Sequence, residues 1–215
     1  YTQHQHQATG PTQRCIRHRS GNPGMYNQKT TKIVIPKLNT VYFLGIGGIG
    51  MSAIARYLLK AGVEVHGYDK TPSTLTAQLE QEGMNIHFTD SPELIPTTTD
   101  LIIYTPAVPN VLDEFVQSKA SGKPMMKRSE FLGLLTQDKK TIAVAGTHGK
   151  TSVSSTVAHI FNGSVQGCTA FLGGIAKNYD SNILVNPASD YMVVEADEFD
   201  RSFLRLNPWL AVITS

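Results

Sequence analysis

The sequence predicts an α/β fold with two parallel sheets that follow one another along the chain. Two observations support this prediction. Short apolar runs alternate with amphipathic stretches over most of the 215 residues, and strands alternating with helices form parallel sheets covered on both faces. In addition, two glycine-containing loops, 45–50 and 146–152, each follow an apolar strand-like run. We therefore expect two successive domains, each built around one such loop.

The first domain is expected over residues 38–136. In its first helix, Ile54 and Leu58 share one face, whereas Arg56 falls on another. The expected elements, in chain order, are a strand at Val41–Ile46, a helix at Ile49–Ala61, a strand at Val63–Tyr68, a helix at Ser73–Glu82, strands at Asn85–Phe88 and Asp100–Tyr104, a helix at Val111–Ala120, a strand at Pro124–Met126 and a helix at Ser129–Leu135.

A polar joint over residues 137–140 leads into the second domain, expected over 141–215. Because the sequence stops at Ser215 directly after a strand, we expect this domain to be truncated. Its elements are a strand at Thr141–Ala145, a helix at Lys150–Phe161 and strands at Cys168–Phe171, Tyr191–Glu195 and Leu210–Thr214, with turns at Gly173-Gly174 and Asn186-Pro187.

The first 37 residues differ in composition from the rest. They hold 6 of the 19 basic residues and none of the 17 acidic ones, and they are rich in Gln, His and Thr. So few apolar groups cannot offset the entropy cost of folding, so this leader is expected to be disordered to about Thr30. It is interpreted as an upstream extension foreign to the native chain, with Met25 as a start inside it; an RNA-binding arm is the alternative.

The composition also limits the class of protein. The chain is 40% hydrophobic, enough for a buried core. No apolar stretch reaches the length of a membrane span or a secretory signal. Cys15 and Cys168 are too few for a disulfide framework or metal cluster. We expect a soluble cytoplasmic protein that neither enters a membrane nor binds nucleic acid; its oligomeric state cannot be read from the sequence.

The first glycine loop has the spacing of a dinucleotide-binding turn. After the strand, Gly45 permits a tight turn, Gly47 lets backbone amides approach a pyrophosphate, and Gly50 lets the helix pack on the sheet. Asp69, at the end of the second strand, can accept a hydrogen bond from a ribose hydroxyl. The motif indicates a nucleotide diphosphate only, because NAD, FAD and UDP-sugars all satisfy it, and a turn needed for packing alone is the structural alternative.

The second loop resembles a P-loop. Gly149, Lys150 and Thr151 match its G-K-[ST] end, where the lysine meets the β and γ phosphates and the hydroxyl binds Mg²⁺. Val144 stands where the common pattern has glycine, so this loop is shorter. We expect ATP to be bound by Gly146, Thr147, His148, Gly149, Lys150, Thr151 and Ser152.

An acidic run follows the strand that ends at Glu195. Carboxylates at the carboxyl end of a parallel strand lie beside the phosphate loop, where one can bind Mg²⁺. Glu195 is the best candidate because it ends the strand, so Thr151 and Glu195 are the predicted metal ligands. Asp197, Glu198 and Asp200 could instead cap or orient their neighbours, and a solvated acidic turn is the alternative for the run as a whole.

Together these segments resemble the Mur ligases. The resemblance covers residues 38–215 and is carried by Gly45 to Ala55, by Gly146 to Thr151, and by Glu195 to Glu198 with Asp200 and Ser202 to Leu204. His148 and the stretch Arg201 to Leu204 are most similar to members that add L-alanine; members that recycle murein tripeptide are the alternative.

The resemblance implies a Rossmann-like UDP-sugar-binding domain followed by an incomplete P-loop-type ATP-binding domain. In the family, the carboxylate of UDP-N-acetylmuramate attacks the γ-phosphate of ATP, and the amine of L-alanine then displaces phosphate in peptidoglycan precursor synthesis. By this analogy Lys150 is catalytic, and the reaction requires ATP and Mg²⁺. His148 could contact phosphate or substrate, or it could make a hydrogen bond within the loop. The sugar nucleotide is held by Gly45, Gly47, Gly48, Ile49, Gly50, Asp69, Thr105, Pro106 and Ala107.

The sequence departs from the family by lacking a further metal motif, a carbamylated lysine, the rest of the ATPase domain and a third domain. The chain alone is therefore expected to be inactive in ligation. Two other classes stay open. A nicotinamide-dependent oxidoreductase would use the first loop and leave the P-loop unexplained, and a noncatalytic nucleotide-binding module would use both loops without turnover.

Overall fold

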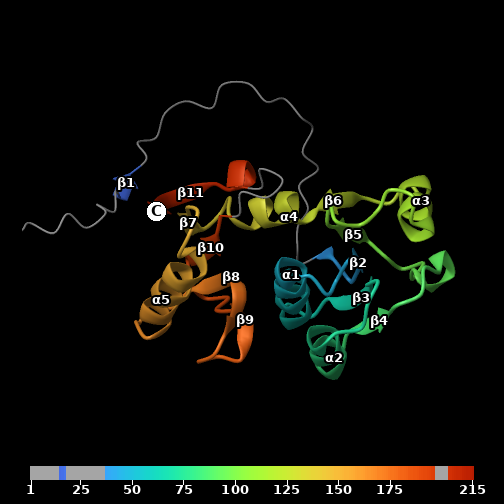
Figure 1. The fold of residues 1–215 in the computed structure, drawn as a ribbon, viewed down its shortest axis with the longest axis horizontal. Helices are drawn as coiled ribbons and strands as arrows, with labels where there is room; N and C mark the ends of the chain where they lie inside the picture. The colour runs from blue at the N-terminus through green and yellow to red at the C-terminus, as the bar shows by residue number, and fades with distance from the viewer. Residues whose placement is uncertain (1–14, 18–36, 197–202) are drawn as a thin grey trace, which may run out of the picture.

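The computed structural model describes residues 15–17, 37–196 and 203–215, which form two sheets with helices around and between them (Figure 1). The first sheet has five parallel strands in the order β4-β3-β2-β5-β6. The strands are β2 Thr40–Leu44, β3 Glu64–Tyr68, β4 Asn85–His87, β5 Leu101–Tyr104 and β6 Met125–Lys127. The helices of this domain are α1 Ile49–Lys60, α2 Thr74–Gln81, α3 Asp113–Ala120 and α4 Arg128–Leu135, with a 3-10 helix, η2, at Pro92–Leu94.

The strand order of this sheet places a ligand-binding edge between β2 and β5. The chain leaves β2 toward β3 on one side and later returns to β5 on the other. At such a switch point the loops after the strands diverge and leave a crevice at the carboxyl ends. Every residue of β2 is buried, as expected for the central strand of a sheet covered on both faces.

The second sheet has six strands in the order β1-β11-β7-β10-β8-β9. Strands β11, β7, β10 and β8 are parallel, while β1 and β9 pair antiparallel at the two edges. The elements are β7 Lys140–Ala145, α5 Lys150–Asn162, β8 Thr169–Ala176, β9 Ser181–Leu184, β10 Tyr191–Glu195 and β11 Pro208–Ile213, with β1 at Cys15–Arg17. A turn at 136–139 joins α4 to β7, where the sequence analysis places a joint.

The predicted α/β fold is confirmed, with three local corrections. Gly173 and Gly174 were expected in a turn, but both lie inside β8, which is longer than predicted. The strand β9 was not predicted, because four residues after a polar turn give a weak pattern. The leader was expected to lack structure as far as Thr30, yet Cys15–Arg17 pair with β11; the rest of it lies outside the described residues.

The two sheets share a core, because α1 and α4 lie between them (Figure 1). One cluster of buried side chains runs from Phe43 of β2 through Leu58 of α1 to Phe171 of β8. The rings of Tyr57 and Phe171, one from each domain, are 5.5 Å apart. Burial of α1 on two sides therefore fixes the first glycine loop relative to the second domain.

Candidate active site

A cavity of about 720 Å³ opens at the carboxyl edge of the first sheet, a volume in the usual range for a small-molecule site. Its walls come from the segments that follow β2, β3, β4, β5 and β6. Of the predicted sugar-nucleotide residues, those lining it are Gly45, Gly47, Gly48, Gly50, Asp69, Thr105 and Ala107. The fold thus gathers seven of the nine residues around one space. Ile49 and Pro106 line other hollows.

The glycine loop is shaped by close approaches that side chains would prevent. Gly45 has a φ of 85°, which favours glycine. A Cβ at Gly47 would lie 2.9 Å from Asp69 Oδ2, and the Gly47 N–H donates to that same oxygen at 2.7 Å. Asp69 therefore holds the loop as well as lining the cavity. This contact adds to the ribose-accepting role predicted for it, which stays a prediction.

The cavity wall also includes a phenol near several carboxylates. Tyr68, at the end of β3, is buried, and its pKa is raised first by that burial and then by the charges of Asp90, Glu114 and Asp69. Its hydroxyl is therefore neutral and able to donate a hydrogen bond at physiological pH.

Arg128 is a cavity residue that the sequence analysis missed. It begins α4, directly after β6, and lines the same cavity as Asp69 and Asp90. A Cβ at Gly50 would lie 2.6 Å from Arg128 Nη1. Gly50 was predicted to allow helix–sheet packing, but in the structure the absent side chain makes room for the guanidinium. A basic residue at the carboxyl end of a parallel strand was the available signal.

The second loop connects β7 to α5 and begins and ends in conformations that favour glycine. Gly146 has a φ of 131° and Gly149 a φ of 79°. Lys150 is the first residue of α5, and its Nζ donates to the carbonyl oxygen of Gly146 at 2.6 Å. The ammonium is thus held at the loop where a P-loop lysine meets phosphate.

Thr151 and Glu195, the predicted metal ligands, are in direct contact. The Thr151 hydroxyl lies 2.9 and 3.1 Å from the two Glu195 carboxylate oxygens. The Gly173 N–H donates to Glu195 Oε2 at 3.0 Å, and a Cβ at Gly173 would lie 2.2 Å from that oxygen. Hydroxyl and carboxylate oxygens suit Mg²⁺, so these residues fit a magnesium ion; no group of three or more ligands occurs among the described residues.

The remaining predicted ATP-binding residues follow the same loop. Thr147, His148 and Ser152 are exposed. The main chain of His148 is tied to the residues after β11, because its N–H donates to the Ser215 carbonyl at 3.0 Å and its carbonyl accepts from the Thr214 hydroxyl. Its imidazole role stays a prediction. Asp197, Glu198 and Asp200 lie outside the described residues.

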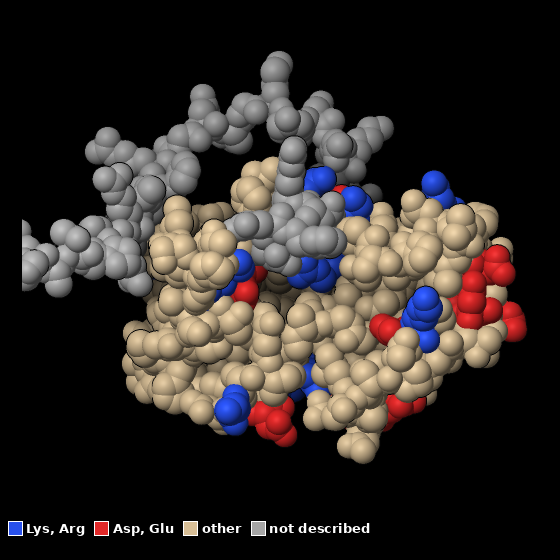
Figure 2. Space-filling view, viewed as in Figure 1, with Lys and Arg blue, Asp and Glu red and all other residues tan. Residues whose placement is uncertain are grey.

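A second, smaller cavity of about 200 Å³ lies between the first glycine loop and Glu195, the residue that contacts Thr151 of the second loop. Gly50 and Arg128 line it from the first domain, and Gly173 and Glu195 line it from the second. Gly50 and Arg128 also line the large cavity, so the two spaces adjoin at these residues. The space-filling view shows basic side chains around the hollow between the two halves of the molecule (Figure 2).

Fold and site together define an α/β protein of two sheets, each with a glycine loop between a strand and the helix that follows it. Residues 40–140 match the Mur ligase family, catalytic domain. These residues therefore form a Mur ligase family domain.

Its relatives and structural neighbours carry consistent names. The chain is 53% identical over 184 residues to the UDP-N-acetylmuramate–L-alanine ligase of Phocaeicola vulgatus, and 52% identical over 187 residues to that of Parabacteroides distasonis. These matches cover 83% and 84% of this chain but 40% of each relative. The chain thus spans about two fifths of the length of the curated relatives it matches.

Among solved structures, the UDP-N-acetylmuramate-alanine ligase of Thermotoga maritima matches with a TM-score of 0.72 and 33% identity, over 79% of this chain and 39% of that one. The Neisseria UDP-N-acetylmuramate:L-alanyl-γ-D-glutamyl-meso-diaminopimelate ligase matches with a TM-score of 0.75 and 24% identity, over 81% of this chain and 59% of that one. At 24% identity, the match to the Neisseria structure is evidence for the fold alone.

Proposed function

We propose that this chain provides the sugar-nucleotide site and the phosphate loop of an ATP-dependent ligase that joins L-alanine to the carboxylate of UDP-N-acetylmuramate. The observation that carries the proposal is the small cavity shared by Arg128 and Glu195. It adjoins a pocket of nucleotide size at Gly50 and Arg128 and reaches Glu195, which contacts Thr151 of the P-loop, an arrangement that a dehydrogenase or a simple ATPase does not need. The identities of the acid and the amine in this proposal are taken from the names of the relatives.

In this proposal the large cavity holds UDP-N-acetylmuramate with its diphosphate at the start of α1. The helix N-terminus and the Arg128 guanidinium both favour an anion there. The acid group of the sugar then extends past Gly50 toward the small cavity, where the second domain begins. The first domain thereby presents a carboxylate to the P-loop.

The second domain would hold ATP against residues 146–152. The carboxylate oxygen attacks the γ-phosphorus, the bond to the β,γ-bridging oxygen breaks, and ADP leaves. The amine of L-alanine then attacks the acyl phosphate, and phosphate leaves after the amine loses a proton. Lys150 exchanges its hydrogen bond to Gly146 for the transferring phosphoryl group and neutralises its charge.

Thr151 and Glu195 would hold Mg²⁺ beside the phosphate loop. A bound magnesium ion neutralises negative charge on the β and γ phosphate oxygens. The Gly173 amide keeps the Glu195 carboxylate turned toward the loop. The oxygen ligands of this pair, rather than nitrogen or sulfur, favour magnesium over zinc.

Binding of the nucleotides to this chain tests the first half of the proposal. Titration calorimetry should show binding of UDP-N-acetylmuramate and none of NAD⁺. Binding of NAD⁺ instead would return the first domain to the dehydrogenase class. We propose a cytoplasmic location, where nucleotides and ATP are available; among the described residues, no helix is both long and apolar enough to cross a bilayer.

Turnover tests the second half. Because the chain spans 40% of its relatives, phosphate release is measured with a protein in which this chain is continued by the remaining part of the Phocaeicola vulgatus relative. Release should require UDP-N-acetylmuramate and L-alanine together. Release with L-alanyl-γ-D-glutamyl-meso-diaminopimelate in place of L-alanine would identify a tripeptide-adding ligase, and binding of both nucleotides without release would indicate a noncatalytic module.

A further inference from the structure

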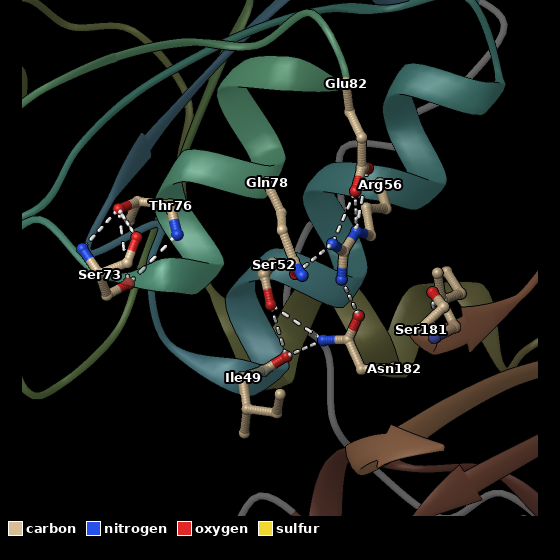
Figure 3. A network of polar contacts seen from close by, with 10 residues as sticks. Ile49, Ser52, Arg56, Ser73, Thr76, Gln78, Glu82, Ser181 and Asn182 are labelled. Carbon is tan, nitrogen blue, oxygen red and sulfur yellow. Dashed lines mark hydrogen bonds and ion pairs between the residues drawn. The ribbon is translucent and has the colours of Figure 1, made fainter. Parts of the chain in front are cut away.

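Asn182, on the edge strand β9 of the second domain, is fully buried against the first helix of the first domain. Its Nδ2 donates to the Ile49 carbonyl oxygen at 2.6 Å and to Ser52 Oγ at 2.9 Å. Its Oδ1 accepts from Arg56 Nη1 at 2.7 Å. One amide group therefore makes three hydrogen bonds to α1, all across the boundary between the domains (Figure 3).

Arg56 connects Asn182 to the end of α2. The arginine is 3% exposed, and its Nε and Nη2 donate to the Glu82 carboxylate at 2.6 to 2.9 Å. A buried guanidinium needs such a partner, because an unpaired charge in the core costs several kcal/mol. The sequence analysis placed Arg56 on a different face from the apolar residues of α1. In the structure that face is covered by β9.

Both contacts made by Asn182 Nδ2 fall on the first turn of α1, directly after the glycine loop. Ile49 is the first residue of α1, and Ser52 lies in its first turn, where its hydroxyl donates to the Ile49 carbonyl at 2.9 Å. This turn is the end of the helix that faces an anion in the proposed sugar-nucleotide site. Asn182 thus holds the first turn of α1 through Nδ2 and the middle of the helix through Arg56.

Strands β8 and β9 form a hairpin, and its β8 strand reaches the proposed magnesium site. Strand β9 pairs with β8, and Gly173 of β8 donates its N–H to Glu195. Glu195 in turn contacts Thr151 of the P-loop. A continuous series of hydrogen-bonded groups and paired strands therefore runs from the first glycine loop, through Asn182 and the β8–β9 hairpin, to the phosphate loop.

We propose that Asn182 is a positioning residue that sets the two phosphate loops at the separation the reaction requires. The inference rests on the proposed ligase function. A carboxylate and a γ-phosphate held on separate domains react only when both are aligned, and a displacement of about 1 Å costs about 100-fold in rate. Asn182 contacts α1 and lines neither of the two cavities in which the reactants are proposed to lie. Its loss should lower turnover while substrate binding is kept.

Asn182→Asp is the most selective test. The variant keeps an oxygen that can accept from Arg56, but it places a second oxygen where Nδ2 donates to the Ile49 carbonyl, so the tether to α1 becomes repulsive. The matched control is Asn178→Asp, the same chemical change on an exposed position in the turn of the same hairpin. If Asn182→Asp does not fold, Ser52→Ala removes one contact of the amide and little volume.

Two measurements are made on each protein. In the chain continued by the remainder of its relative, kcat for phosphate release should fall about 10- to 100-fold in Asn182→Asp, with the KM and Kd of UDP-N-acetylmuramate within about threefold of the parent. In this chain with Cys15→Ser, spin labels at the exposed positions Val116 and Val165 report the distance between domains. Its distribution should be narrow in the parent and in Asn178→Asp, and broad in Asn182→Asp.

The outcomes separate this inference from the proposed function. An unchanged distance distribution and unchanged kcat in Asn182→Asp would overturn the positioning role. So would a loss of kcat that is matched by a loss of sugar-nucleotide binding, since that pattern indicates a damaged pocket. A parent protein that binds its nucleotides but does not release phosphate would refute the ligase instead, while the spin-label distances would still decide whether Asn182 ties the domains together.

Discussion

The two glycine loops of this protein use opposite charges to hold their own backbones. In the first loop a carboxylate accepts from a loop amide, Asp69 Oδ2 from the Gly47 N–H. In the second loop an ammonium donates to a loop carbonyl, Lys150 Nζ to the Gly146 oxygen. The first loop borders a cavity of about 720 Å³, whereas the second is tied to the residues after β11.

This difference indicates how each loop would meet its ligand. The first loop keeps its shape through Asp69, which stays in place when a nucleotide occupies the cavity. The second loop uses the very group that a triphosphate needs, so Lys150 must exchange the Gly146 oxygen for phosphate oxygens. We therefore expect the first site to be largely preformed and the second to rearrange on binding.

The largest effect is expected for Lys150→Ala. The variant removes the charge that would neutralise the transferring phosphoryl group, so phosphate release should fall by at least about 100-fold. Binding of UDP-N-acetylmuramate should be unchanged, because Lys150 belongs to the second loop. The control is Lys177→Ala, which removes an exposed lysine from the β8–β9 turn. Turnover equal to that of the control would refute the catalytic role.

Glu195→Gln should have the next largest effect, on the requirement for magnesium. The amide oxygen can still accept from Thr151 and Gly173, but the negative charge that attracts the ion is lost. The Mg²⁺ concentration for half-maximal phosphate release should rise about 10- to 100-fold. Glu80→Gln, at an exposed position in α2, is the matched control. An unaltered magnesium titration would show that Glu195 only orients the loop.

Arg128→Gln tests the first loop in the same way. Removing a charge-assisted hydrogen bond costs about 1.5 to 3 kcal/mol, so the Kd of UDP-N-acetylmuramate should rise about 10-fold or more in calorimetry. Comparing this ligand with UDP-N-acetylglucosamine, which lacks the acid group, separates two contacts. Equal losses for both ligands place Arg128 at the diphosphate, and a loss for the acid alone places it at the carboxylate. Unchanged affinity for both would remove Arg128 from the site.

The smallest effect concerns stability rather than binding, and it arises in the first domain. Glu114 is fully buried, and this burial raises its pKa above its ordinary value of 4.5 despite hydrogen bonds from Ser91 and Tyr42. The folded state therefore holds the proton more tightly than the unfolded chain does. The contribution of protonated Glu114 to the free energy of unfolding is complete below pH 4.5 and is lost as the pH rises through the pKa of Glu114 in the folded state.

Glu114→Gln removes that pH dependence. Between pH 4.5 and 7, the free energy of unfolding should fall less in the variant than in the parent. The difference between the two proteins should be about 1.4 kcal/mol for each unit by which the Glu114 pKa is raised in the folded state. Urea unfolding at pH 5 and pH 7 measures the difference. Parallel behaviour of the two proteins would show that Glu114 titrates alike in the folded and unfolded chains.

Much of the fold could be predicted because its signals are local. Apolar runs identified β2 and β10, and the glycines at 45 and 149 identified the turns that follow strands, since both have positive φ. Strand β9 was missed because an edge strand of four residues has too few positions for a clear pattern. Gly173 and Gly174 were predicted to form a turn because paired glycines commonly mark turns. In the structure they lie in β8, where a side chain at Gly173 would clash with Glu195.

The candidate site was predictable only in part. Asp69 and Thr105 directly follow parallel strands and Glu195 ends one, and this placement alone brought them to the carboxyl edges of the two sheets. Arg128 was overlooked because its place at the end of β6 is a weak local signal, and its approach to Gly50 depends on the packing of α4 against α1. The proximity of Arg128 to Gly50 joins segments 78 residues apart in sequence.

The sequence by itself determined most of the strands and helices in their order, the two glycine loops and the acid that ends β10, because hydrophobic periodicity and glycine conformation act over a few residues. Only the tertiary structure decided that Arg56 is buried, because the covering residue, Asn182, lies 126 positions further along the chain. Contacts at that separation depend on how two domains pack, and packing selects partners by shape and by hydrogen bonding that neither segment shows alone.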